Sequence, residues 1–184
     1  MASFVTEDID KRVLIIGCGN PSRSDDSVGL YLINEINRRV GNPPIRADVT
    51  FAGMEDNGEG DGWLTTAFVQ QLGPELADVI KDYDLVIFVD AHTGVYAEEI
   101  RFVEVVPSYV TSAFSHHLEP AAIVALAEML YNSRPRAFAV SVRGYDFQFG
   151  TELSETTRAL ADQALDRVML VLGQHCGSQL QGKP

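Results

Sequence analysis

Three polar segments of the sequence hold carboxylates and imidazoles at spacings that could serve a metal-type site. The first, residues 17–29, reads GCGNPSRSDDSVG and contains two adjacent carboxylates. The second, residues 90–94, reads DAHTG, and the third, residues 115–120, reads SHHLEP. Carboxylate oxygens and imidazole nitrogens suit first-row divalent metals such as nickel or zinc, and three protein ligands with open coordination positions make a site for substrate or water. The residue types therefore favour a metal-type site over three unrelated structural groups.

The same residues also have a structural interpretation. Asp90 directly follows an apolar run, where an aspartate can cap a helix or bond a neighbouring loop as readily as it can bind a ligand. His92 is a candidate for orienting Asp90 or for lining the site. A lone histidine is more often structural than functional, but His116 and His117 are adjacent and lie just before an expected helix.

A nucleotide site is the main alternative for the first segment, because a glycine-rich turn after an initial strand can bind phosphate. The dinucleotide pattern would need a third glycine at position 22, which is Ser22, and the chain lacks the Gly-Lys-Ser/Thr of a P-loop. Asp25 and Asp26 would also repel phosphate at the start of the following helix. The segment suits a cation or a polar peptide, which argues against a flavodoxin-like cofactor binder.

Hydrophobic periodicity predicts alternating strands and helices. Continuous apolar runs such as residues 85–89 (LVIFV) indicate parallel strands that are buried on both faces. The expected strands are 13–16, 48–52, 85–89, 100–106 and 137–142, and the expected helices are 27–40, 65–71, 74–81, 120–130 and 154–172, the last with Ser154 as its cap. This order predicts an α/β fold: a three-layer sandwich with a mostly parallel, twisted sheet of about five strands and helices on both faces.

The chain is expected to form a single domain over residues 1–184, with residues 1–10 and 175–184 as flexible tails. In an open parallel sheet, ligands bind beyond the carboxyl ends of the strands. The first two polar segments directly follow expected strands, and the third leads into a helix. The sheet should therefore bring the three segments together.

Charge and composition exclude several classes of function. The formal net charge of −12 argues against a nucleic-acid partner, which would need clustered Lys and Arg. No apolar run approaches the roughly 18 residues of a membrane helix, and the acidic N-terminus lacks the pattern of a signal peptide. The two cysteines, Cys18 and Cys176, suggest no disulfide framework. We therefore expect a cytoplasmic protein without a membrane partner.

The sequence resembles the [NiFe]-hydrogenase maturation endopeptidases, a peptidase family M52-like group, over most of its length. The resemblance is carried by Gly17-x-Gly19-Asn20-Pro21-x-Arg23-x-Asp25-Asp26-x-x-Gly29, by Val89-Asp90-Ala91, and by Ser115-His116-His117 before an apolar helix. In that family, an acidic residue of the first loop, an aspartate after a central strand and a histidine before a helix bind a metal. The resemblance implies that Asp26, Asp90 and His117 are these ligands, with Asp26 standing where some members have Glu.

The resemblance also implies an activity and a partner. Such enzymes remove a C-terminal extension from the precursor of the hydrogenase large subunit after nickel insertion, and they recognise the nickel that the substrate holds. The protein would therefore need no permanently bound cofactor, and it would act as a monomer. The segments 71–77 (QLGPELA) and 115–118 (SHHL) resemble members that serve soluble, NAD(P)-linked hydrogenases.

Further residues receive roles in this scheme. Asp25 is a candidate base or orienting group, and Asn20 and Arg23 are candidates for holding the substrate chain or a developing oxyanion. His92 and His116 are candidates for contacting the substrate. No Ser-His-Asp or Cys-His arrangement can be identified, and Cys18 has no assigned base.

Two other functions fit part of the pattern. A metal-binding escort protein for hydrogenase assembly would use the same ligands without cutting. A small-molecule hydrolase or transferase could use the same architecture, because a fold does not determine a function. That last alternative predicts a closed, partly apolar pocket, whereas a protease that acts on a folded partner needs an open cleft.

Overall fold

Strands and helices alternate along the part of the chain that the computed structural model describes, residues 11–46, 63–109 and 118–176. The elements in order are β1 (Val13–Cys18), the short 3-10 helix η1 (Ser24–Ser27), α1 (Val28–Val40), β2 (Leu64–Val69), α2 (Leu76–Ile80), β3 (Leu85–His92), β4 (Ile100–Glu104), α3 (Pro120–Tyr131), β5 (Arg136–Arg143) and α4 (Glu155–His175).

The strands form one sheet in the order β2-β1-β3-β5-β4. β1 pairs in parallel with both β2 and β3, and β3 pairs in parallel with β5. β4 is antiparallel to β5, so Arg101, the second residue of β4, lies opposite Ser141 near the end of β5. The start of β4 therefore lies at the same edge of the sheet as the carboxyl ends of the parallel strands.

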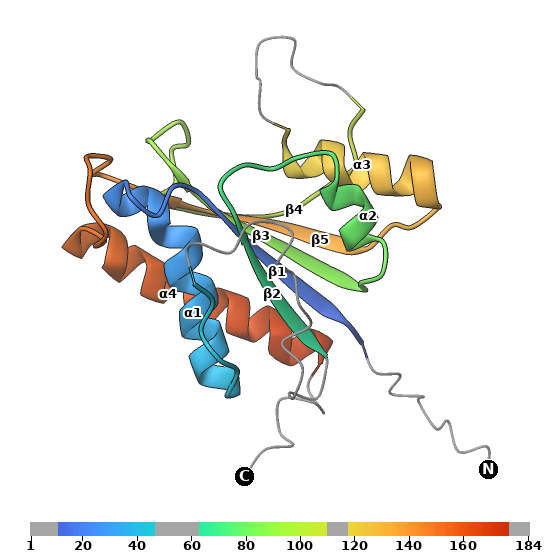
Figure 1. Ribbon diagram of the computed structural model, residues 1–184, viewed down its shortest axis with the longest axis horizontal. Helices are drawn as coiled ribbons and strands as arrows, with labels where there is room; N and C mark the ends of the chain where they lie inside the picture. Colours follow the sequence, from blue (N-terminus) through green and yellow to red (C-terminus); the bar gives the residue numbers. More distant parts are fainter. Residues whose placement is uncertain (1–10, 47–62, 110–117, 177–184) are drawn as a thin grey trace.

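Helices cover both faces of the sheet, with α1 and α4 on one face and α2 and α3 on the other (Figure 1). The alternation of side chains along each strand divides the core between the two faces. In β1, Val13 and Ile15 pack on the α1/α4 side, whereas Leu14 and Ile16 pack on the α2/α3 side. The expected three-layer sandwich with a mostly parallel five-stranded sheet is confirmed.

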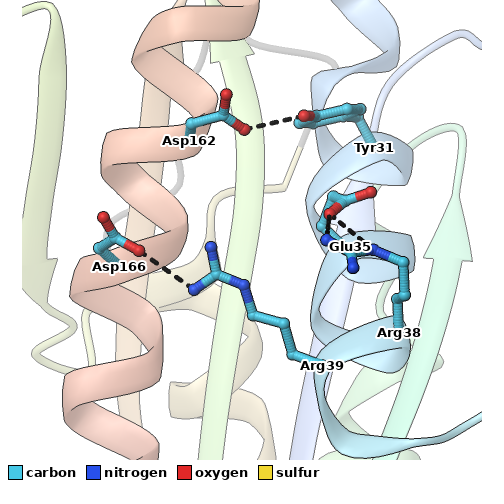
Figure 2. Close-up of polar contacts among 6 residues, drawn as sticks. All are labelled: Tyr31, Glu35, Arg38, Arg39, Asp162 and Asp166. Carbon is cyan, nitrogen blue, oxygen red and sulfur yellow. Dashed lines mark hydrogen bonds and ion pairs between the residues drawn. The ribbon is translucent and has the colours of Figure 1, made fainter.

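Polar contacts border the apolar interface between α1 and α4 (Figure 2). The Tyr31 hydroxyl donates a hydrogen bond of 2.8 Å to Asp162 Oδ1, and Arg39 pairs with Asp166 at 3.1 Å. Burial and the hydrogen bond to Asp162 raise the pKa of Tyr31 to about 12. Because exposed ion pairs contribute at most about 1 kcal/mol, the interface depends mainly on the buried face of α1, which includes Ile33.

Most of the expected elements are present, with shifted ends. The expected helix over 65–71 is wrong, because residues 64–69 form strand β2, which pairs with β1 from Leu64 opposite Val13. Its residues, LTTAFV, include the β-branched and aromatic types that favour strands. The expected strand 48–52 and the expected tail at 1–10 lie outside the described residues. The expected flexible tail over 175–184 is wrong at its start, because His175 is the last residue of α4 and Cys176 is buried; residues 177–184 lie outside the described residues.

The N-terminal end of α1 lies unusually close to β1. A Cβ atom on Gly29 would come within 2.5 Å of the Cys18 carbonyl oxygen and 2.6 Å of its nitrogen, and a Cβ on Gly17 would meet the Gly29 oxygen at 2.6 Å. These neighbours are backbone atoms, so they have no rotamer by which to move away. Glycine at both positions lets the helix start pack directly on the strand.

We predict that Gly29→Ala lowers the free energy of unfolding by about 1–3 kcal/mol, the range for forcing extra atoms into a packed site. The matched control is Gly173→Ala in α4, where an added Cβ meets no atom within 4 Å. This second change should raise stability by up to about 1 kcal/mol, because alanine favours a helix over glycine. Urea unfolding of both variants measures the effects, and equal stabilities would contradict the close packing of α1 on β1.

Candidate active site at the carboxyl edge of the sheet

The topology places a crevice beyond the ends of β1 and β3. From β1 the chain passes through α1 to β2 on one side, whereas β3 is followed by strands on the other side of the sheet. Ligands of open α/β sheets bind at such a reversal of strand order, outside the carboxyl ends of the strands. The loop after β1 carries Asp25 and Asp26, and β3 carries Asp90 near its end. Two of the three polar segments of the sequence therefore meet at this edge.

Asp26 is held against the turn that follows β1. Its Oδ2 accepts a 2.9 Å hydrogen bond from the backbone N–H of Asn20. Gly19 has a φ of +128°, and a Cβ there would lie 1.8 Å from the Asp26 carbonyl oxygen. Glycine at position 19 is thus required both by the backbone conformation and by the approach of Asp26. The half-buried Asp26 carboxylate keeps lone pairs that this single bond does not use.

Asp25 is a fully buried anchor that ties this loop to the segment between β5 and α4. Its backbone N–H donates to the Asp146 carbonyl at 2.9 Å. Its carboxylate accepts hydrogen bonds from Tyr145 N, Asp146 N, Ser154 N, Ser154 Oγ and Thr157 Oγ1, at 2.7, 2.8, 2.6, 2.8 and 2.7 Å. Ser154 also caps α4 by accepting from Thr157 N at 3.3 Å. A single carboxylate thus joins the candidate site to the start of the longest helix.

Two opposing effects act on the pKa of Asp25. Burial alone would raise this pKa, but the hydrogen bonds from Asp146, Tyr145, Ser154 and Thr157 outweigh burial and lower it. The side chain is therefore ionised near neutral pH. A carboxylate already engaged by five donors is suited to orienting a loop, which was one of the two roles expected for Asp25.

Asp90 lies at the open end of β3, where its side chain is exposed. Its Oδ1 accepts a 2.7 Å hydrogen bond from the N–H of Ala91. Cys18, the last residue of the neighbouring β1, is buried, and its thiol pKa is raised well above the ordinary value, first by burial and then by the charge of Asp90. Cys18 is therefore a neutral thiol and a poor nucleophile. Asp90 thus lies close to Cys18, whereas Asp26 lies against the next residue, Gly19.

A cleft of about 380 Å³ extends from Asp90 across the α2/α3 face of the sheet. Its floor consists of strand side chains, including Phe88 and Val103, and one wall is the start of α3 from Leu118 to Ala121. The exposed carboxylates of Asp90, Glu104 and Glu119 border it. Such a space can receive several residues of an extended chain.

The other expected substrate residues make contacts within the chain. Asn20 Oδ1 accepts from Ser22 N at 2.9 Å, which closes the turn. Arg23 is exposed, and its Nε donates to the Phe147 carbonyl at 3.1 Å. His92 is 5% exposed, its Nδ1 accepts from Gly94 N at 3.2 Å, and its ring meets the Tyr96 ring edge-on at 5.1 Å. These contacts stabilise the local structure of the chain, and none of them prevents the same side chains from contacting a substrate.

The histidine part of the predicted metal site is not described. His116 and His117 lie outside the described residues. Within the part of the chain that the structure does describe, no three side chains of His, Cys, Asp or Glu come together closely enough to hold a metal ion. The set Asp26, Asp90 and His117 stays a prediction.

Tyr96, Arg101 and Ser141 are among the residues that line the cleft without having been predicted from the sequence. A signal for Arg101 was present, because it is the one cation in the strand IRFVE and its neighbours alternate between the two faces of the sheet. The antiparallel direction of β4 brings Arg101 to the same edge as Asp90. No sequence pattern indicates this direction.

Several solved structures with a similar fold are hydrogenase maturation proteases. The hydrogenase maturating endopeptidase HybD from E. coli matches with a TM-score of 0.64 at 20% identity, over 89% of this chain and 93% of its own. The [NiFe] hydrogenase maturation protease HycI from Thermococcus kodakarensis KOD1 matches with a TM-score of 0.56 at 19% identity, over 91% and 93%. The hydrogenase 2 maturation peptidase from a Thaumarchaeota archaeon gives 0.56 and 19%, over 89% and 99%.

This chain has the fold of these endopeptidases. The fold that the sequence resemblance implies is therefore confirmed over most of the chain. No protein-family model matches the sequence, and no curated protein matches it. In the described segments, no helix combines the length and the apolar character that a membrane crossing requires.

We predict that Asp25→Asn lowers the free energy of unfolding by about 2–4 kcal/mol near neutral pH, because an amide cannot accept all five hydrogen bonds and its NH₂ would face donors. The lowered pKa of Asp25 sets the pH dependence. Its contribution is complete above the ordinary pKa of about 3.9 and is lost as the pH falls through the folded-state value. The difference between wild type and variant should therefore shrink in acid, which denaturant titrations over a pH series measure.

The matched control for this prediction is Asp146→Asn in the same region. Asp146 is exposed, and its side chain accepts one hydrogen bond of 2.9 Å, from Gln148 N. This variant should lose less than about 1.5 kcal/mol. An equal loss in both variants would show that Asp25 is no special anchor.

Proposed function

We propose that the protein is an endopeptidase that removes the C-terminal extension of a [NiFe]-hydrogenase large-subunit precursor after nickel insertion, acting as a monomer in the cytoplasm. We expect the precursor to belong to a soluble, NAD(P)-linked hydrogenase. The observation that carries the proposal is the position of Asp26 and Asp90 near the carboxyl end of β1. They lie at the crevice of a fold that known maturation endopeptidases share.

The proposed chemistry begins with nickel that the precursor already holds. Asp26 and Asp90, together with His117, would contact this nickel and so fix the position of the scissile peptide bond. Lewis-acid polarisation of the scissile carbonyl or of a water molecule is the chemistry that the metal would supply. Two carboxylates suit this contact, because hard oxygen ligands and imidazole bind divalent first-row metals.

Asp25 has the positioning role in this scheme. Its carboxylate holds the loop that carries Asp26 against the β5–α4 segment, which limits the positions that Asp26 can take. Cys18 is excluded as a nucleophile by its raised pKa and its burial. The proposed cleavage therefore acts on a peptide that the metal orients, and it does not pass through a covalent intermediate on Cys18.

The shape of the cleft favours a peptide substrate over a small molecule. Exposed side chains border it, and its floor extends over three neighbouring strands, from Phe88 on β3 through Ala139 on β5 to Val103 on β4. A closed apolar pocket would suit a small-molecule hydrolase better. The open form also suits a protease that must reach a chain end on a folded partner.

We predict that the protein converts a nickel-loaded large-subunit precursor to a form shorter by one defined C-terminal peptide, and that Asp90→Ala and His117→Ala each slow this conversion at least about 100-fold. Loss of one electrostatic contact to the reacting group typically has an effect of this size. Mass spectrometry of the precursor over time measures the conversion.

The matched control is Asp82→Asn at the opposite end of β3. Asp82 is exposed and lies 3.4 Å from Lys81, so its loss should leave the conversion unchanged. If the wild type binds the precursor but leaves its mass unchanged, the protein is a metal escort and the peptidase proposal is wrong. Full activity of Asp90→Ala would overturn the assigned site.

A further inference from the structure

A row of side chains crosses the α2/α3 face of the sheet at the level of Asp90. Asp90 on β3 lies opposite Ser141 on β5, and Ser141 lies opposite Arg101 on β4. All three residues line the cleft. The alternation along each strand confirms their common face, because their sequence neighbours Val89, Val140 and Ile100 pack on the α1/α4 side.

The guanidinium group of Arg101 is held in place by an aromatic ring. It lies 4.4 Å from the centroid of the Tyr96 ring, and Tyr96 in turn packs against the buried His92. Stacking on a ring fixes the plane of a guanidinium while leaving its N–H donors free to bind another group. Arg101 is thus oriented before any substrate arrives.

Arg101 lacks a described carboxylate partner, unlike Arg136 at the start of the adjacent strand β5. Arg136 Nε donates to Glu104 at 2.9 Å, so Glu104 on the border of the cleft is already paired. Among the described residues no carboxylate pairs with Arg101, which is also the only basic side chain among the described residues that line the cleft. The charge of Arg101 is therefore available to a ligand.

The distance between Asp90 and Arg101 suits a short stretch of extended peptide. Two strand spacings of about 4.8 Å separate them, which gives about 10 Å. Extended chain advances by about 3.3 Å per residue, so about three residues cover this distance. A peptide whose scissile bond lies at Asp90 would place a side chain about three residues away beside Arg101.

We propose that Arg101 is a specificity-determining residue that binds a side-chain carboxylate of the precursor about three residues from the cleaved bond. This inference rests on the proposed function. A planar guanidinium binds a carboxylate through two parallel hydrogen bonds, which a neutral side chain does not match. The carboxylate belongs either to the part of the precursor that remains or to the released peptide, depending on the direction of the chain in the cleft.

The test uses nickel-loaded large-subunit precursors that carry Glu, Gln or Lys at each of the positions two to four residues from the cleaved bond, on either side. Wild-type protein should process the Glu form about tenfold faster in kcat/KM than the Gln form at one of these positions, and the Lys form more slowly still. Arg101→Gln should lose this preference. Arg101→Glu should reverse it and favour Lys at the same position, a rescue that a purely structural role of Arg101 would not produce.

The matched control is Arg134→Glu, which removes an exposed arginine near the start of β5, at the other end of the sheet, 3.7 Å from Glu128. This variant should keep the wild-type preference. Thermal unfolding of both Arg101 variants checks that they are folded. If Arg101→Glu is unfolded, Arg101→Gln alone decides the outcome.

Three results separate the outcomes. A preference that disappears in Arg101→Gln supports the inference, and its side of the cleaved bond identifies the source of the carboxylate. The inference is overturned if wild type processes the Glu, Gln and Lys precursors with the same kcat/KM, or if Arg101→Gln keeps the wild-type preference. Either result leaves the peptidase proposal standing. No processing of any precursor by wild type overturns both.

Discussion

The buried carboxylate of Asp25 is the interaction on which the arrangement of the site depends. It accepts hydrogen bonds from two consecutive backbone N–H groups after β5 and from the first residues of α4, while its own backbone is bonded back to the same segment. Two loops that are more than a hundred residues apart in sequence are thereby joined at one point. The next residue, Asp26, receives its orientation from this junction and from the turn at Gly19.

The two adjacent aspartates illustrate how local environment divides the work of identical side chains. Asp25 is fully buried and its carboxylate is filled by donors, which hold its pKa low. Asp26 is half-buried and accepts a single described backbone hydrogen bond, so it retains acceptor capacity at the crevice. One residue step along a 3-10 turn thus separates a carboxylate filled by donors from one that can still accept. The close packing of Gly17 against Gly29 holds together the two ends of the loop that carries Asp25 and Asp26.

Sequence reasoning predicted the architecture because the core strands are continuous apolar runs and the helices carry clear stripes and caps. It failed at residues 64–69, where a strand of only six residues precedes two glutamines and shows little alternation. Pairing with β1, a long-range contact, decides the structure of that segment. The same holds for the site residues. Asp26 and Asp90 could be predicted to lie at one edge of the sheet from the expected strands before them, whereas the anchoring role of Asp25 depends on donors more than a hundred residues away. Arg101 was missed because its position depends on the direction and sheet position of β4.

The place of β4 in the sheet also has a consequence for how the protein is assembled during synthesis. Among the described strands, β4 pairs only with β5, and β5 follows β4 in the sequence with α3 in between. When β4 leaves the ribosome, its partner strand has not yet been made, so β4 cannot pair within the sheet before β5 has emerged. The Asp90 half of the cleft can form from β1 and β3 earlier, whereas the Arg101 half waits for β5. A nascent chain that already carries Asp26 and Asp90 therefore still lacks the second half of the cleft, and the cleft is completed only when most of the chain has emerged.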